Sequence, residues 1–245
     1  MKDYTPRKFS EKKWHNSIEL SKKIIQENDI SNYVFIKDFK NVKNYVGSNL
    51  DIFVWNLKDV KKISSILEEM WFYLPKIDFE FDKYMYIPPN FREDTQVYAP
   101  IHIYPYLGWY TLRIDLFKIK YSQIIYNKSR NWINIFPDAY EVPLILFHWY
   151  LEDRELPNYD IYHLNYIREN KSYDISHSLE ILDDRYKDSF IYLYNYYLQN
   201  SKNEEIKFKD FSKHLSVALK QTNSIFRKLY FITIHLLKWL KIIRW

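Results

Sequence analysis

The side chains best suited to phosphate chemistry lie in one short stretch, Gly47-Ser48-Asn49-Leu50-Asp51. Asn49 and Asp51 are two residues apart at the start of an apolar run, so in a strand they share one face. An amide oxygen and a carboxylate on one face can hold a divalent metal ion, and the N–H groups of a Gly-Ser turn can bind a phosphate. The stretch therefore indicates a site that positions and neutralises phosphate groups, as phosphoryl-type transfer requires.

The scarcity of glycine also supports a role for the predicted turn at Gly47. The chain of 245 residues contains only two glycines, Gly47 and Gly108. Glycine reaches backbone conformations that other residues avoid, so a chain this poor in glycine is expected to use it where geometry requires it. Leu50 and Ile52 alternate with the two polar side chains and are expected to face the core.

The pattern of apolar residues predicts a sheet followed by helices. Period-2 and β-branched runs predict strands at 33–37, 51–55, 77–87, 96–104 and 110–118. Helical periodicity predicts helices at 10–27, 58–70, 138–152, 177–199, 207–221 and 225–244. This order indicates an α/β (α+β) fold, with a sheet domain over residues 1–137 and a helical C-terminal region over residues 138–245.

The Gly-Ser stretch resembles the nucleotidyltransferase superfamily, which includes DNA polymerase beta. The pattern of that superfamily is Gly-Ser followed by two acids separated by one apolar residue at the start of a strand. Gly47, Ser48 and Asp51 match this pattern, and Asn49 departs from it. A longer similarity, over about residues 30–165, is to an uncharacterised prokaryotic group of nucleotidyltransferases. It is carried by Ile101-His102-Ile103 leading to Trp109, and by the segments Ile135-Phe136-Pro137, Leu146-Phe147-His148 and Leu151-Glu152.

The resemblance implies a nucleotidyltransferase-type mixed sheet with flanking helices. It also implies magnesium-dependent transfer of a nucleotidyl group from a nucleoside triphosphate to an acceptor that the sequence does not identify. Gly47 and Ser48 are then expected to bind phosphate, and Asp51, Asn49 and Asp115 are expected to be the catalytic and metal-binding residues.

The third acid of the family is expected on a strand next to the motif. Asp115, on the strand predicted at 110–118, is the candidate, with Asp78 and Glu80 as alternatives. The strand that carries His102 is a less suitable source, because the residue two before His102 is Pro100 and not an acid. Pro100 also suggests that this strand lies at an edge of the sheet. His102 is interpreted as a side chain that packs or bonds inside the fold rather than as a metal ligand, and His148 as a core or interface histidine.

Asn49 weakens the case for catalysis, since an amide oxygen brings no negative charge to a hard cation. An alternative interpretation is a catalytically impaired member of the fold that acts as a nucleotide-binding or protein- or membrane-interaction module. The sequence thus leaves open whether the chain is an enzyme. The lack of cysteine excludes disulfides, thiolate metal sites and cysteine nucleophiles.

The C-terminal segment is basic and amphipathic. Residues 225–245 carry five cations and no acid, so the charge of this segment equals the net charge of the whole chain, +5. A uniform nucleic-acid-binding surface is therefore not indicated. The absence of an apolar leader or spanning stretch favours a cytoplasmic location, and the segment is expected to pack on the protein or contact a partner or membrane surface. Its apolar residues recur at spacings of 4, 3, 4, 3 and 4: Ile225, Leu229, Ile232, Leu236, Trp239 and Ile243.

Overall fold

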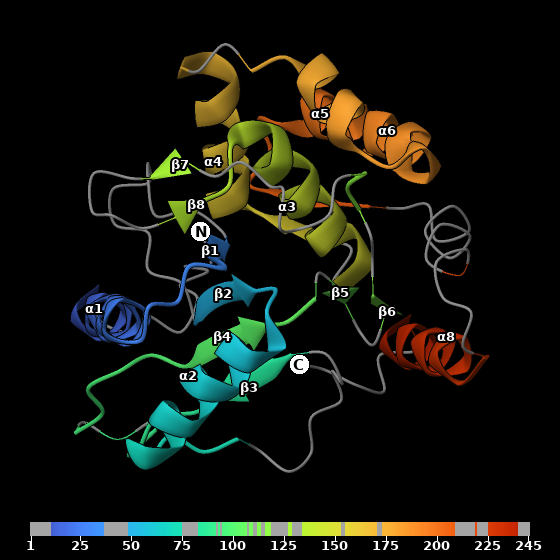
Figure 1. The fold of residues 1–245 in the computed structure, drawn as a ribbon. Coiled ribbons are helices and arrows are strands. Elements are labelled where there is room, and N and C mark those ends of the chain that lie inside the picture. Colours follow the sequence, from blue (N-terminus) through green and yellow to red (C-terminus); the bar gives the residue numbers. More distant parts are fainter. Residues whose placement is uncertain are drawn as a thin grey trace. The chain divides into compact units, whose positions relative to one another are not determined.

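The computed structural model contains two compact units. Figure 1 shows the helices and strands of the chain, coloured along the sequence. Unit 1 consists of Met1–Asp78, Lys83–Tyr106 and Ile119–Glu141, and unit 2 of Phe79–Asp82, Leu107–Lys118 and Val142–Trp245. The last change between the units falls at Glu141–Val142, within the helix that begins at Asp138. The structure describes residues 11–36, 49–74, 83–91, 93, 95–106, 108–109, 112–113, 116–118, 127–128, 134–152, 155–170, 173–208, 219 and 225–239.

A mixed sheet with the strand order β3-β4-β2-β1-β8-β7 forms the framework of unit 1. β2 pairs in parallel with β4 and antiparallel with β1, while β1 pairs in parallel with β8. Two antiparallel edge pairs complete the sheet, β3 with β4 and β7 with β8. The strands are β1 Tyr33–Ile36, β2 Leu50–Val54, β3 Tyr84–Tyr86, β4 Ile101–Tyr104, β7 Asn127–Lys128 and β8 Asn134–Ile135.

One face of this sheet is covered by α1 (Glu11–Glu27) and α2 (Leu57–Glu69). The two helices bury apolar side chains against alternate residues of the strands, including Leu50 and Ile52. This confirms the expectation that the residues alternating with Asn49 and Asp51 face the core. α2 begins where the Asn56 side chain accepts a hydrogen bond from the Lys58 N–H, which satisfies one free donor at the helix start.

Unit 2 is mainly helical. A two-stranded sheet joins β9 to β10, and a second joins β5 to β6. Its helices bury large aromatic side chains, among them Phe190 and Tyr197, whose hydroxyl donates to Asn165 Oδ1 at 2.7 Å. Burial raises the pKa of Tyr197. The elements are α3 Asp138–Glu152, which starts in unit 1, β5 Gly108–Trp109, β6 Leu112–Arg113, β9 Glu155–Pro157, α4 Asn158–Asn170, α5 Ile175–Ile181, α6 Asp184–Asn200, β10 Glu205–Lys207 and α8 Ile225–Trp239.

The mixed α/β class predicted from the sequence is confirmed. Several element bounds were wrong. The helix predicted at 177–199 is two helices, because the chain turns at Leu182, which forms a β-bridge with Phe117. The strand predicted at 96–104 begins only at Ile101, and α4, β9 and β10 were not foreseen. The helix predicted at 207–221 lies largely outside the described residues.

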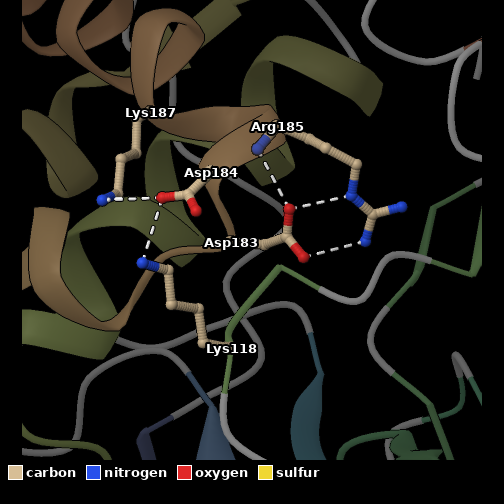
Figure 2. A network of polar contacts seen from close by, with 5 residues as sticks. All are labelled: Lys118, Asp183, Asp184, Arg185 and Lys187. Atoms are coloured by element: carbon tan, nitrogen blue, oxygen red, sulfur yellow. Dashed lines mark hydrogen bonds and ion pairs between the residues drawn. The ribbon is translucent and has the colours of Figure 1, made fainter.

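The turn before α6 is fixed by hydrogen bonds and ion pairs (Figure 2). The Asp183 carboxylate caps α6 by accepting from the Arg185 N–H at 3.0 Å, and it also accepts from the Arg185 guanidinium at 2.8 and 3.1 Å. Asp184 contacts Lys118 at 3.0 Å and Lys187 at 2.8 Å. These contacts attach residue 118 to the start of α6, next to the bridge at Leu182.

Replacing Asp183 with alanine should lower the free energy of unfolding by about 1 kcal/mol at neutral pH, because α6 loses its cap. The hydrogen bond from the Arg185 side chain lowers the pKa of Asp183 below its ordinary value. Because the pKa of Asp183 is lower in the folded than in the unfolded state, its carboxylate stabilises the fold at pH values above the unfolded-state pKa. This contribution is lost as the pH falls through the folded-state pKa. The difference from wild type should therefore shrink between neutral pH and about pH 3.

Urea unfolding at both pH values measures this difference. Asp188→Ala is the matched control, since Asp188 is exposed within the same helix. A loss of stability that is equal at pH 7 and pH 3 would contradict the capping role of the Asp183 carboxylate.

Candidate functional site

The site is built where β2 lies beside β4. The two strands are parallel and in a register that places Asp51 directly opposite His102. Side chains opposite each other on neighbouring strands lie on the same face, so Asp51, His102 and Tyr104 project together. This face is the one opposite to the α1/α2 core, because Leu50 and Ile52 occupy that core.

Asp51 is the centre of a buried polar cluster. Its side chain is 5% exposed, and its Oδ1 atom accepts a hydrogen bond from the Tyr104 hydroxyl at 3.1 Å and another from Asn49 Nδ2. Nδ1 of His102 lies 3.2 Å from the same oxygen. Burying a carboxylate is costly unless donors replace its water, and the Tyr104 hydroxyl and the Asn49 amide supply such donors. We name Asn49, Asp51, His102 and Tyr104 the Asp51 cluster.

Two further contacts border the Asp51 cluster. Nζ of Lys83 lies 5.4 Å from the centre of the Tyr104 ring, a distance at which a cation is attracted to an aromatic face. Further along β2 the face becomes apolar, since the Phe53 ring stacks on Phe136 with centroids 6.3 Å apart. The polar groups are therefore confined to the end of the strand at which Asn49 lies.

The structure brings together two of the residues predicted from the sequence, Asn49 and Asp51. Gly47, Ser48 and Asp115 lie outside the described residues, so their roles stay predictions. The same holds for the alternative acids, Asp78 and Glu80.

His102 and Tyr104, the two β4 residues that contact Asp51, are not among the site residues predicted from the sequence, although His102 was expected to pack or bond inside the fold. The expectation that β4 is an edge strand was wrong, because β4 lies between β3 and β2. Pro100 precedes the first residue of the strand, and its carbonyl accepts a hydrogen bond from the Leu50 N–H at 2.8 Å. The alternation Ile101-His102-Ile103-Tyr104 was the available signal, since it sets two polar-tipped side chains on one face.

The described residues fit a magnesium ion only in part. The Asp51 cluster offers one carboxylate and one amide as oxygen ligands. Within the part of the chain that the structure describes, no group of three or more His, Cys, Asp or Glu side chains could hold a metal ion. Magnesium is commonly held by one or two carboxylates together with water and substrate phosphates. Asp51 therefore suits an ion that arrives with a nucleotide better than an ion held by the protein alone.

Comparison with known proteins finds distant structural similarity. No protein-family model and no curated protein matches the sequence. Two solved structures from Helicobacter pylori are similar over 96% of this chain and 100% of theirs: JHP933, at 13% identity and a TM-score of 0.39, and a protein described as a "putative nucleotidyltransferase from H. pylori", at 12% identity and a TM-score of 0.40. Likenesses this distant carry no argument about the reaction.

The Tyr104 hydroxyl should contribute measurably to stability. Tyr104→Phe removes one donor from a buried carboxylate, and a hydrogen bond to a charged group is worth about 1.5–3 kcal/mol. Thermal unfolding of Tyr104→Phe, Asp51→Ala and the double variant forms a double-mutant cycle that isolates the contact, because alanine removes the acceptor oxygens. Strictly additive losses in this cycle would contradict a direct interaction between the two side chains.

Proposed function

We propose that the chain binds a nucleoside triphosphate together with magnesium at the Asp51 cluster and transfers the nucleotidyl group to an acceptor. The observation that carries the proposal is the buried Asp51 carboxylate on β2, with Asn49 beside it and two further polar side chains from β4 around it. The Gly47-Ser48 sequence just before β2 supports the proposal, because the Gly-Ser turn predicted from the sequence would suit a phosphate.

Each residue of the cluster has a part in this proposal. Asp51 would hold the ion against the phosphates, and Asn49 would add a neutral oxygen ligand. The ion, when bound, would neutralise phosphate charge during transfer. Tyr104 and His102 would keep the Asp51 side chain in one orientation, since both approach the same oxygen atom. Because the cluster has only one carboxylate, the ion is expected to bind weakly unless a nucleotide is present.

A second candidate function is nucleotide binding without transfer. Asn49 favours it, since its amide replaces the acid expected at that position and donates a hydrogen bond to Asp51. The two candidates share the binding step and differ only in whether a nucleotidyl group leaves the triphosphate.

Calorimetric titration of the purified chain with each of the four ribonucleoside triphosphates, with and without magnesium, tests the shared step. We expect binding that requires both components, and little heat from magnesium alone. Release of pyrophosphate in the presence of candidate acceptors then separates transfer from binding alone. Absence of magnesium-dependent binding for every nucleotide would refute both candidates.

A further inference from the structure

The helix α8, Ile225–Trp239, presents large apolar side chains to solvent. The exposed fractions are 68% for Ile225, 82% for Phe226, 57% for Leu229 and 43% for Leu236. Phe231 on the same helix is fully buried. α8 thus has one side that is packed and another that is apolar and open.

The exposed apolar residues lie close together on the helix surface. At 100° per residue, Ile225, Leu229 and Leu236 fall within about 40° of one another, and Phe226 lies about 60° beyond them. Phe231 points about 140° away from Phe226 and about 120° away from Ile225, the two edges of that group, and so lies on the packed side. We name Ile225, Phe226, Leu229 and Leu236 the α8 stripe. Such a cluster on a soluble surface is typical of an interaction site.

The charge of the segment indicates what covers the α8 stripe. Arg227, Lys228, Lys238, Lys241 and Arg244 give residues 225–245 five positive charges, and the segment contains no Asp or Glu. Pairing two copies through the α8 stripe would bring like charges together, which is unfavourable. An anionic surface is complementary to the segment, and a phosphate-bearing lipid bilayer combines that charge with an apolar interior.

We propose that α8 docks on an anionic lipid bilayer, with the α8 stripe inserted among the lipid chains. An amphipathic helix that lies in the interface combines apolar burial with attraction between its cations and anionic headgroups. Aromatic residues are favoured at this depth, and the segment carries Phe226, Trp239 and Trp245. No helix among the described residues is long and apolar enough to span a membrane. This proposal does not depend on the Asp51 cluster.

Vesicle co-sedimentation of the full chain tests the proposal. We expect binding to vesicles of phosphatidylglycerol and phosphatidylcholine, little binding to phosphatidylcholine alone, and a decline as salt screens the charges. The double variant Phe226→Ser, Leu229→Ser should reduce the partition coefficient by about tenfold or more, because two large side chains no longer leave water. The triple variant Arg227→Gln, Lys228→Gln, Lys238→Gln should reduce binding to the anionic vesicles and weaken its dependence on salt.

Matched controls distinguish binding through α8 from nonspecific adsorption to vesicles. Trp71 in unit 1 is 83% exposed, so Trp71→Ser removes an equally open aromatic side chain outside α8. Lys58, Lys61 and Lys202 are exposed lysines outside α8, and their triple change to glutamine removes the same charge. Both controls should bind anionic vesicles like wild type. Circular dichroism and melting temperature verify that every variant is folded.

Three results would overturn the proposal. The first is a folded full-length chain that ignores anionic vesicles. The second is an equal loss of binding in the Trp71→Ser control. The third is a dimer of the wild-type chain that dissociates in the Phe226→Ser, Leu229→Ser variant, which would assign the α8 stripe to a second copy.

Discussion

Replacing Asp51 with asparagine is expected to remove magnesium-dependent nucleotide binding while leaving the fold intact. The substitution keeps the shape of the side chain and its acceptor oxygen, so Tyr104 can still donate to residue 51. It removes the only carboxylate in the Asp51 cluster, and the affinity of a hard cation falls with ligand charge. We expect the dissociation constant of the nucleotide with magnesium to rise at least about thirtyfold, equivalent to ~2 kcal/mol.

Calorimetric titration in the presence and absence of magnesium measures this effect. Asp188→Asn makes the same chemical change at an exposed position of α6 and should bind as wild type does. Full magnesium-dependent binding by folded Asp51→Asn would show that the ion is held elsewhere, and the proposed site would be wrong.

The part of the site that depends on local geometry could be predicted from the sequence. Strand side chains alternate with a period of two, so the common face of Asn49 and Asp51 follows from their spacing alone. The same rule assigned Leu50 and Ile52 to the core, which is confirmed. The resemblance to nucleotidyltransferases also includes Asp51 of this strand.

The part that depends on strand pairing could not be predicted. Tyr104 and Asp51 are separated by 53 positions, and their contact requires β4 to pair in parallel with β2 in one particular register. A shift by one residue would turn His102 and Tyr104 to the other face. Nothing in the local pattern of either strand specifies that register.

The break between α5 and α6 has a similar origin. Helical periodicity runs through 177–199, yet the chain turns at Leu182 and Asp183. The turn is fixed by partners distant in sequence, since the Asp183 N–H donates to the Leu116 carbonyl at 3.0 Å and the Lys118 N–H to the Ile181 carbonyl at 2.8 Å. Asp183 as a capping residue was the local signal for this boundary.

Restoring an acid at position 49 should convert the cluster into a site that binds magnesium without a nucleotide. In the native chain the Asn49 amide donates a hydrogen bond to Asp51. This bond satisfies one acceptor of the carboxylate but does not neutralise its charge. Asn49→Asp removes that donor and sets two carboxylates against each other. Without metal the variant should therefore lose about 1–3 kcal/mol of stability at neutral pH, as expected for a buried acceptor that loses its partner.

The pH dependence of that loss follows from the repulsion. Two adjacent carboxylates raise the pKa of one member of the pair in the folded state. A carboxyl whose pKa is higher in the folded than in the unfolded state destabilises the fold at pH values above its unfolded-state pKa. The loss of stability in Asn49→Asp should therefore diminish as the pH falls towards about 4, where that carboxyl binds a proton. Urea unfolding of the metal-free variant across this range measures the change.

Magnesium should reverse the loss, because a divalent cation between two carboxylates replaces repulsion with attraction. A ligand that binds only the folded state at a hundredfold excess over its dissociation constant adds about 2.7 kcal/mol. The melting temperature of Asn49→Asp should therefore rise with magnesium concentration in the absence of nucleotide, whereas that of wild type should change little. Asn49→Ala is the control, since it removes the same hydrogen bond without adding charge and should not respond to magnesium. If Asn49→Asp is destabilised and magnesium does not restore it, the two carboxylates do not hold the ion without a nucleotide, and this prediction is wrong.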